Sequence, residues 1–579
     1  MLVEIQKRDY EFFQKLNKVS FFSAIDIFFS KKLNPKNENQ AIFFAYIFLI
    51  SRLGFVSLQI EKDSIYPKPE DLNIENDNSN TIDEEIYRVI SQKVMEGSQT
   101  NLDNAMGSKE DELNANELLK YPLCRFQNFY YLQRNYFFET KIIENLKTLA
   151  ISKPDEIFLK EEFQKLLENE EILGADQKKA ISNALKNSIS FILGGPGTGK
   201  TYVASHLINI FSKSLDLTKK KELQIAATSF TGKATSHLKS NIFKHAKNVQ
   251  IEAKTLHSLL NLREGKNKFF KDQKIDFDLI LVDESSMIDI KLMAYLLDAI
   301  KKGTRIVFIG DPNQLPPIVG GNLFKEIVDV LPNQASILKR AHRFDNNIIL
   351  DLAKAIDLEN EKNIVDILDN KIDFFDIETI NAAKNNIFDM AKDNFFEPQN
   401  KKLQISNVLN RINDFRILSS IKKGPFGVDT LNKEIFSIFY RKAKTDDFLY
   451  VPIIITKNNY KLDLYNGQVG ILSYQKTDSG LTRGIAHFQM DGQVKSYSIY
   501  YLNSFEYAYA ISIHKSQGSE FEKAIVIIPE TQKSFSKELF YTAVTRVKNK
   551  LYLISSKKII FDLIKKQSFK KSALSKRYS

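Results

Sequence analysis

The feature that most constrains the fold is a glycine-rich loop placed between a strand and a helix. From residue 194 to residue 201 it reads Gly194-Gly195-Pro196-Gly197-Thr198-Gly199-Lys200-Thr201. In such a loop, glycines allow backbone N–H groups to close around phosphate oxygens. We expect Lys200 to neutralise charge on the β- and γ-phosphates and the Thr201 hydroxyl to coordinate Mg²⁺. The loop therefore predicts an α/β domain that binds ATP.

Short apolar runs alternate with helix-length segments after residue 173, which is typical of parallel strands buried between layers of helices. These runs are SFILGG, LQIAATS, DLILVDES and TRIVFIGD, followed later by FRILSS, AIVIIPE and LYLISS. Two sets of strands predict two α/β domains. Between FRILSS and AIVIIPE, residues 448–505 carry short strands joined by Asn-Gly and Asp-Gly turns. This pattern favours a small antiparallel barrel inserted into the second α/β domain.

These changes of pattern set the predicted domain boundaries. Residues 1–120 should form a helical region with a loosely ordered acidic connector at about 61–117, and residues 121–170 should complete this N-terminal, partner-contacting domain. We expect the first α/β domain at 171–335, the second at 336–447 and 506–565, the insertion at 448–505, and a solvated basic tail at 566–579. The apolar run 41–50 is too short to span a bilayer and predicts a buried helix.

Composition narrows the class of protein. The single cysteine, Cys124, permits no internal disulfide and no cysteine cluster for a metal, which favours a reducing compartment. The charged N-terminus lacks the apolar stretch of a secretory signal. A net charge of +11 suits a polyanionic partner, although 82 basic against 71 acidic residues is only a mild excess. We therefore expect a cytoplasmic protein without a membrane-spanning segment.

Acidic and amide side chains follow two further predicted strands. The run 279–282 ends in Asp283-Glu284, which puts two carboxylates at the sheet edge where phosphates would lie. We expect Asp283 to hold Mg²⁺ and Glu284 to orient the attacking water, although an acidic pair after a strand is also a common helix cap. The run 305–309 leads into GDPNQLPP, whose turn should hold Gln314 near the γ-phosphate.

Two arginines are candidates for the opposite wall of the nucleotide site. Arg343 lies in KRAHRF and Arg546 lies in YTAVTR. Either could reach across a cleft between the α/β domains and stabilise charge on the transferred phosphoryl group. A single arginine is more often a surface residue, so this prediction depends on the surrounding motifs.

The ordered motifs resemble those of superfamily 1 helicases and, within them, the RecD subunit, or alpha chain, of the bacterial RecBCD enzyme, exodeoxyribonuclease V. They are GADQKKAI, GGPGTGKT, SFTGKA, TLHSLL, VDESSM, GDPNQLPP, AHRF, AISIHKSQGSEF and YTAVTR. ILSSIKKGPFGVDTLN, VPIIITKNNYKLDLYNGQVGIL and FYYLQRNYFFE resemble RecD in particular. The resemblance covers residues 122–556. TSFTGKA departs from the more usual APTGKA, and the acidic stretch before residue 117 has no placed counterpart.

The resemblance implies a 5′ to 3′ DNA translocase with two RecA-like P-loop domains, an SH3-like insertion and a mainly α-helical N-terminal domain. The matching motifs assign adenine recognition to Gln177, nucleotide contact to Gly518 and Glu520, and γ-phosphate sensing to Gln314, Arg343 and Arg546. The resemblance also implies RecB-like and RecC-like partners in a heterotrimer that acts on DNA ends in double-strand break repair and recombination. Any exonuclease activity is then expected in a partner chain.

A translocase needs a groove that follows a single DNA strand by its phosphates and stacks some bases. Candidate DNA-binding residues are Thr231, Lys233, Thr255, His257, Asn466, Gly467, Ser512, His514 and Ser516. His257 could equally be a helix-capping or core histidine. We expect cleft closure on ATP to shift one DNA-gripping domain against the other.

Two alternative functions remain open. The chain could be a stand-alone 5′ to 3′ helicase, although no glycine-rich helix-hairpin-helix repeats precede the motifs. It could also be a mainly regulatory subunit whose ATP site only switches partner contacts. Hydrolysis is favoured over such a switch by the intact hydrolytic residues Lys200, Asp283, Glu284 and Arg546.

Overall fold

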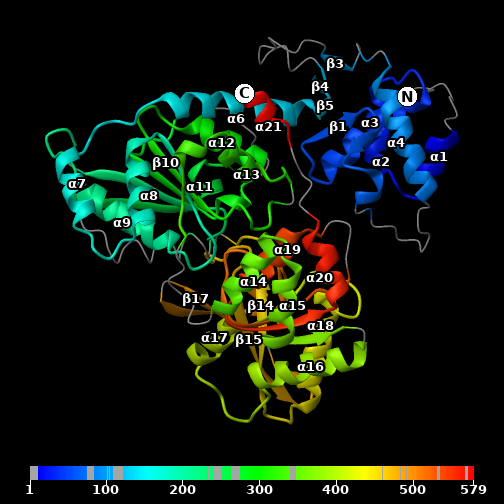
Figure 1. Ribbon diagram of the computed structural model, residues 1–579. Coiled ribbons are helices and arrows are strands. Elements are labelled where there is room, and N and C mark those ends of the chain that lie inside the picture. Colours follow the sequence, from blue (N-terminus) through cyan, green and yellow to red (C-terminus); the bar gives the residue numbers. More distant parts are fainter. Residues whose placement is uncertain are drawn as a thin grey trace.

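The computed structural model forms three lobes, an N-terminal one and two α/β ones (Figure 1). The described residues are 11–72, 74, 84–100, 102, 105–107, 121–220, 222–232, 235, 238, 249–262, 274–317, 319–339, 347–377, 379–459, 461–482, 484–490, 492–502, 504–530, 535–566 and 572–579. Within these ranges, no helix is long and apolar enough to cross a membrane.

The N-terminal lobe packs helices against a small sheet. Its helices are α1 (Glu11–Lys18), α2 (Ala24–Lys32), α3 (Glu38–Arg52) and α4 (Glu84–Ser98), with a 3-10 turn η1 (Pro69–Asp71). Its strands β1 (Ser57–Glu61), β2 (Ser64–Tyr66), β3 (Met106–Gly107), β4 (Leu123–Phe126) and β5 (Phe129–Leu132) run in the order β2-β1-β5-β4-β3. Helix α3 is buried over most of its length, which confirms the prediction for residues 41–50.

Two features of this lobe differ from the sequence expectations. The loosely ordered connector at about 61–117 is wrong for residues 84–98, because Ile90 and Val94 on α4 are buried in the apolar core beside α3. Their four-residue spacing places them on one face of a helix. The acidic composition of the surrounding stretch gave no sign of this helix. The sheet adds strands to a region for which only helices were expected, since its strands are too short to give a clear alternating pattern.

The first α/β domain is a parallel sheet between two helix layers. Its strands are β6 (Ile189–Leu193), β7 (Leu223–Ser229), β8 (Val249–Thr255), β9 (Leu279–Asp283), β10 (Arg305–Gly310) and β11 (Ala335–Ile337), in the order β11-β6-β10-β9-β7-β8. Its helical elements are α6 (Gln133–Ile151), α7 (Lys160–Glu168), α8 (Ala175–Lys186), α9 (Lys200–Lys213), α11 (Leu256–Leu259), η2 (Ser285–Met287), α12 (Ile290–Ala299), α13 (Leu323–Val330) and η3 (Pro332–Gln334). Successive residues of β6 face opposite cores, Phe191 one and Ile192 the other. The four strand runs predicted from sequence here coincide with β6, β7, β9 and β10.

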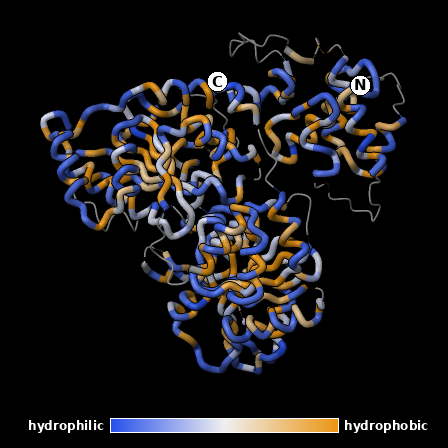
Figure 2. Tube along the Cα trace, viewed as in Figure 1, coloured by the Kyte–Doolittle hydropathy of each residue, from blue (hydrophilic) through white to orange (hydrophobic). Residues whose placement is uncertain are grey.

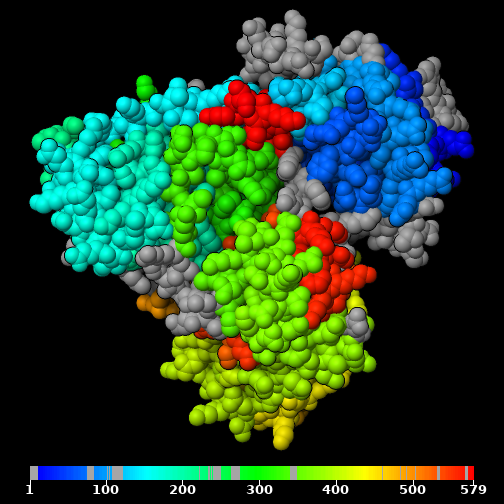
Figure 3. Space-filling view, viewed as in Figure 1, coloured from blue at the N-terminus to red at the C-terminus, as the bar shows by residue number. Residues whose placement is uncertain are grey.

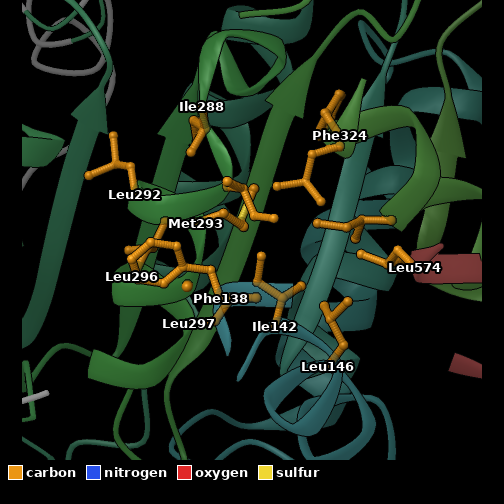
Figure 4. Packing of buried hydrophobic residues seen from close by; sticks show 14 of the residues in the cluster. Phe138, Ile142, Leu146, Ile288, Leu292, Met293, Leu296, Leu297, Phe324 and Leu574 are labelled. Atoms are coloured by element: carbon orange, nitrogen blue, oxygen red, sulfur yellow. The ribbon is translucent and has the colours of Figure 1, made fainter. Parts of the chain in front are cut away.

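Helix α6 belongs to the core of this first α/β domain. Its Phe138, Ile142 and Leu146 pack among Met293 and neighbouring side chains of α12 (Figure 4). Ile142 and Leu146 are fully buried between α6 and the sheet, like the strand residues that they cover. The assignment of residues 133–151 to a separate partner-contact domain is therefore wrong, because these residues complete one apolar layer over the sheet.

The C-terminal segment returns to the same layer. Helix α21 (Leu574–Tyr578) places Leu574 in the core that α6 and α13 form (Figure 4). In the space-filling view, the C-terminal segment lies against the first α/β domain (Figure 3). Arg577 forms an ion pair with Glu139 of α6, with the two side chains 8% and 0% exposed. The expectation of a solvated tail is wrong here, because Leu574 is buried in the core and Arg577 is paired with Glu139. The basic composition of the segment gives no sign of either contact.

The second α/β domain repeats the layered plan. Its parallel strands β12 (Asp373–Asp376), β13 (Phe415–Ser419), β20 (Ala510–Ser512), β21 (Phe521–Ile527) and β22 (Val547–Ser555) lie in the order β12-β22-β21-β13-β20. The surrounding helices are α14 (Asn347–Asp357), α15 (Glu361–Asn370), α16 (Ile380–Asn394), α17 (Ile405–Asp414), α18 (Val428–Lys442), α19 (Lys537–Val544) and α20 (Lys557–Ile564). Hydrophobic residues gather inside both α/β lobes (Figure 2).

An antiparallel sheet is inserted between β13 and β20. Its strands are β14 (Phe448–Ile455), β15 (Val469–Thr477), β16 (Gly480–Leu481), β17 (Ile485–Met490), β18 (Gln493–Ser498) and β19 (Phe505–Tyr507). The order is β18-β17-β15-β14-β19, with β16 on β15, and a 3-10 turn η4 (Ile499–Tyr501) precedes β19. An inserted antiparallel unit is therefore present as expected, although the described strand pairs leave β18 and β19 as unpaired edges.

Candidate nucleotide and DNA sites

The glycine-rich loop runs from the end of β6 to the start of α9. Gly197 and Gly199 have φ values of 72° and 84°, in the left-handed region that favours glycine. The Lys200 ammonium donates to the carbonyl oxygens of Gly194 and Gly195 at 2.8 and 2.9 Å. The ammonium thus lies inside a ring of backbone at a helix N-terminus, where a phosphate group would meet both its charge and free N–H groups.

The acidic pair lies at the carboxyl end of β9, beside β10 and β7. Glu284 has a φ of 50°, and its N–H donates to Asp283 Oδ1 at 2.8 Å. Burial and the neighbouring Glu284 charge raise the pKa of the Asp283 carboxyl to about 7, while Lys200 opposes this shift. Two carboxylates so close together suit a divalent cation, which would neutralise both.

The turn after β10 brings Gln314 to the same edge. Asp311 accepts hydrogen bonds from Asn313 N at 3.0 Å, from Tyr541 Oη at 3.0 Å and from Gln314 Nε2 at 3.4 Å. Gln314 Oε1 is buried and has no hydrogen-bond partner within the described part of the chain. A buried amide oxygen without a donor is costly, so this atom is suited to accept from a ligand or a bound water.

The second α/β domain supplies the facing wall. Arg546 follows α19 and is 3% exposed, with Nε and Nη1 donating to Thr542 O and Ser519 O, both at 3.3 Å. Gly518 and Glu520 precede β21. One pocket of about 290 Å³ is lined by Pro196, Gly197, Gly199, Lys200, Thr201, Asp283, Glu284, Gln314, Gly518, Ser519, Glu520, Arg546 and Lys548. The candidate nucleotide site therefore lies between the two α/β domains.

Comparison with known proteins agrees with this division. Residues 177–320 match a family described as an AAA domain, and residues 507–554 match a UvrD-like helicase C-terminal domain. The RecBCD enzyme subunit RecD of Buchnera aphidicola subsp. Acyrthosiphon pisum is 28% identical, covering 96% of this chain and 99% of that protein. The RecD subunit of Haemophilus influenzae is 27% identical over 85% of this chain and 86% of its own length.

This chain is a RecD-like helicase of superfamily 1. Its enzymatic class is accordingly that of an ATP-dependent helicase, and its first α/β domain binds ATP. The ATP-dependent RecD2 DNA helicase of Deinococcus radiodurans is also similar, at 24% identity over 72% of this chain and 54% of that protein. Among solved structures, a Bacteroides Pif1 helicase in complex with ADP-AlF3 and ssDNA covers 70% of this chain, at 17% identity and a TM-score of 0.36.

Most of the sequence-derived nucleotide residues of the RecD-like helicase meet in the pocket, but some do not line it. Gly194 and Gly195 contribute carbonyl oxygens beneath Lys200, and the Thr198 hydroxyl donates to Gly195 O at 2.9 Å. Gln177 Oε1 accepts from Gly174 N at 3.0 Å and caps α8, and Gln177 Nε2 would lie 3.2 Å from a Cβ on Gly199 of the glycine-rich loop. Adenine recognition by Gln177 stays a prediction. Arg343 lies outside the described residues.

Four residues at this site were missed by sequence reasoning. Ser519 and Lys548 line the pocket, and Tyr541 and Thr542 reach the Asp311 turn from α19. Lys548 lies two residues after Arg546, and its Nζ is 3.8 Å from Glu520 Oε2. Tyr541 and Thr542 stand inside the YTAVTR motif, which was interpreted for its arginine alone.

A second groove of about 380 Å³ lies between the first α/β domain and the second with its insertion. It is lined by Phe230, Thr231, Met287, Asp289, Pro316, Pro317, Val319, Asn466, Gly467, His514, Lys515, Gln517 and Ser519. Four candidate DNA-binding residues, Thr231, Asn466, Gly467 and His514, therefore meet in one groove. Gly467 has a φ of 84°, consistent with the predicted Asn-Gly turn.

The remaining candidate DNA-binding residues lie elsewhere. The Ser516 hydroxyl is fully buried and donates to Ile513 O at 2.7 Å, so it is not available to DNA in this conformation. The Thr255 hydroxyl accepts from Ser258 N and caps α11, and Ser512 Oγ accepts from Lys515 N at 3.3 Å. His257 is exposed beside the Phe230 ring and is therefore not a core histidine. Lys233 lies outside the described residues.

Proposed function

We propose that this chain moves 5′ to 3′ along a single DNA strand and works as a subunit of a RecBCD-type helicase–nuclease. Its partners are then RecB-like and RecC-like chains, its substrate is DNA at duplex ends in double-strand break repair, and its compartment is the cytoplasm. The observation that carries the proposal is the pocket shared by both α/β domains. A ligand that draws the two walls of this pocket together would move one domain relative to the other. Full-length similarity to relatives named as RecD subunits supports the assignment of partners.

The residues of the pocket fit MgATP by their chemistry. Lys200 and Arg546 place positive charge on opposite walls, where a γ-phosphoryl group would lie between them. Thr201 and Asp283 would hold Mg²⁺, which when bound supplies charge neutralisation at the phosphates. Glu284 would take a proton from the attacking water, and Gln314 Oε1, which accepts no hydrogen bond from the described residues, would orient the same water.

The second groove is the proposed path of the DNA strand. Its wall combines the Phe230 ring and prolines, which offer apolar faces to bases, with the charged Lys515. Gly467 and Asn466 come from the inserted sheet, for which we propose an SH3-like fold. Because the first and the second α/β domains each supply part of the wall, their relative movement would shift one grip on the strand against the other.

The test of the ATP site is Lys200→Gln, with Lys213→Gln at the exposed end of α9 as the matched control. Loss of the ammonium should lower ATP hydrolysis stimulated by single-stranded DNA at least about a hundredfold, since a positive charge at the phosphates is lost. The control variant should hydrolyse ATP at the rate of the unaltered chain. Retention of the parent rate in Lys200→Gln would contradict the assignment.

A partner surface is proposed on helix α2. Phe28 and Phe29 are 54% and 42% exposed there, beside the exposed Ile25, and neighbouring exposed apolar side chains often mark a protein interface. Phe28→Glu should reduce co-purification with RecB-like and RecC-like chains. The control is Leu217→Glu, which adds the same charge at an exposed apolar residue of the first α/β domain. Equal complex formation by both variants would contradict the assignment of this surface, and absence of a complex with the unaltered chain would argue for a stand-alone helicase.

A further inference from the structure

The turn that carries Gln314 is held from the second α/β domain by three hydrogen bonds. Tyr541 Oη donates to Asp311 Oδ2 at 3.0 Å, Leu315 N donates to Thr542 Oγ1 at 2.7 Å, and Gln517 Nε2 donates to Leu315 O at 2.8 Å. Both backbone polar groups of Leu315 are therefore satisfied across the cleft. All three hydrogen bonds would be lost if the two domains separated by more than about an ångström, because hydrogen bonds weaken steeply beyond their normal length.

Tyr541 also touches the nucleotide loop. A Cβ on Gly195 would lie only 3.2 Å from Tyr541 Oη, so the hydroxyl is packed directly behind the loop. The side chain is buried, and burial together with the Asp311 charge raises the pKa of Tyr541 well above its ordinary value. The hydroxyl is thus a proton donor at physiological pH, and Asp311 accepts from it and from the Gln314 amide at once.

The same turn reaches the proposed DNA groove. Pro316 and Pro317 line that groove directly, and so does Gln517, which holds the Leu315 carbonyl. Gln314 lines the nucleotide pocket on the other side. A single turn of the first α/β domain therefore borders both sites, and the second domain fixes it from α19 and from the segment before β21.

We propose that Tyr541 is a positioning residue that holds the Asp311–Gln314 pair in its hydrolytic position only while the two α/β domains are closed. Closure around a DNA strand brings the Tyr541 hydroxyl to Asp311, and the orientated carboxylate fixes the Gln314 amide, so ATP hydrolysis depends on the grip on DNA. Opening removes the Tyr541 hydroxyl and leaves the Asp311 carboxylate with the hydrogen bonds of its own turn, from Asn313 N and Gln314 Nε2. This inference rests on the proposed function and adds a residue to it.

The test is Tyr541→Phe, which keeps the buried ring and removes the hydroxyl. We expect kcat for ATP hydrolysis with saturating single-stranded DNA to fall about tenfold, the effect of one hydrogen bond to a charged group. The KM for ATP and the rate without DNA should stay within about twofold, because the hydroxyl acts only in the closed state. Thermal stability should fall modestly, because the buried Asp311 carboxylate loses one donor, so kcat is compared well below the unfolding temperature of both proteins.

The matched control is Tyr450→Phe. Tyr450 is a buried tyrosine on β14 of the inserted sheet, and its hydroxyl accepts from Leu403 N of the segment before α17 at 2.7 Å. It lines neither the nucleotide pocket nor the second groove. This variant should keep the parent kcat and the parent stimulation by DNA. Asp311→Asn combined with Tyr541→Phe should lower kcat no further than the more damaged single variant, because both changes remove one interaction.

The outcomes separate this inference from the proposed function. Stimulated hydrolysis by the unaltered chain with an unchanged kcat in Tyr541→Phe would overturn the positioning role and leave the motor assignment intact. Equal loss in Tyr541→Phe and Tyr450→Phe, or additive losses in the double variant, would also overturn it. Absence of stimulated hydrolysis in the unaltered chain would overturn both.

Discussion

At the scale of single residues, the proposed nucleotide pocket contains polar groups that lack a hydrogen-bond donor or a neutralising charge from the described residues. Among the residues that the structure describes, none donates a hydrogen bond to the buried Gln314 Oε1. Burial and the Glu284 charge raise the pKa of the Asp283 carboxyl and so oppose its ionisation. Each condition costs stability in the nucleotide-free protein. Such residues are held in place by the surrounding fold, and they gain most when a phosphate and a cation arrive.

Gln314→Leu tests this trade between stability and activity. The change removes the buried amide oxygen and only a long 3.4 Å hydrogen bond to Asp311. The free energy of unfolding of the nucleotide-free variant should therefore lie within about 1 kcal/mol of the parent value. ATP hydrolysis stimulated by DNA should fall at least about tenfold, since the water loses its acceptor. Calorimetry and steady-state kinetics measure the two effects. Gln489→Leu on the exposed side of β17 is the control, and a large loss of stability in Gln314→Leu alone would contradict the account.

At the scale of elements, the C-terminal segment fastens to the first α/β domain although it follows the second. Arg577 lies over the Tyr136 ring at 3.9 Å and pairs with Glu139, whose carboxylate also accepts from Tyr131 Oη at 3.1 Å. Ser572 adds two hydrogen bonds to Glu326 on α13. Cys124 packs in the same core, and burial raises the pKa of its thiol to about 12.

Arg577→Ala should loosen this attachment and expose Cys124. Removal of the guanidinium leaves Glu139 buried with a charge, a loss that typically costs about 3–5 kcal/mol. The thiolate is the reactive form, so in the unaltered chain Cys124 should react with a thiol reagent at pH 8 far more slowly than a free thiol does. The variant should react markedly faster, because a loosened segment admits water. Lys576→Ala is the exposed control, and equal rates in all three proteins would contradict the attachment.

Elements whose signal is local in sequence could be predicted, and those that depend on distant partners could not. The glycine-rich loop and Asp283-Glu284 are contiguous in the chain, and their strands are apolar on both faces, so position and chemistry are both visible. Arg577 meets Glu139 across 438 residues, and Tyr541 meets Asp311 across 230. Helix α6 resembled part of an N-terminal domain because its apolar residues give no sign of which sheet they cover. Ser516 was a candidate because of its place in a motif, and nothing in the sequence indicates that its hydroxyl is buried.

At the scale of the whole molecule, two sites share one pair of domains. The nucleotide pocket and the proposed DNA groove both take residues from the first and second α/β domains, and Ser519 lines both. A ligand that favours the closed arrangement at one site therefore favours it at the other, by reciprocal linkage. In the proposed function, this arrangement would convert an ATP cycle into steps along a strand, and the direction of movement is the most specific consequence of that proposal.

The most direct test is displacement of streptavidin from biotinylated single-stranded oligonucleotides by the chain with MgATP. Movement from 5′ to 3′ pushes against the 3′ end, so we predict faster displacement from a 3′-biotin than from a 5′-biotin. Lys200→Gln should abolish the difference and Lys213→Gln should preserve it. Displacement only from the 5′ end, or ATP hydrolysis without displacement from either end, would contradict the account.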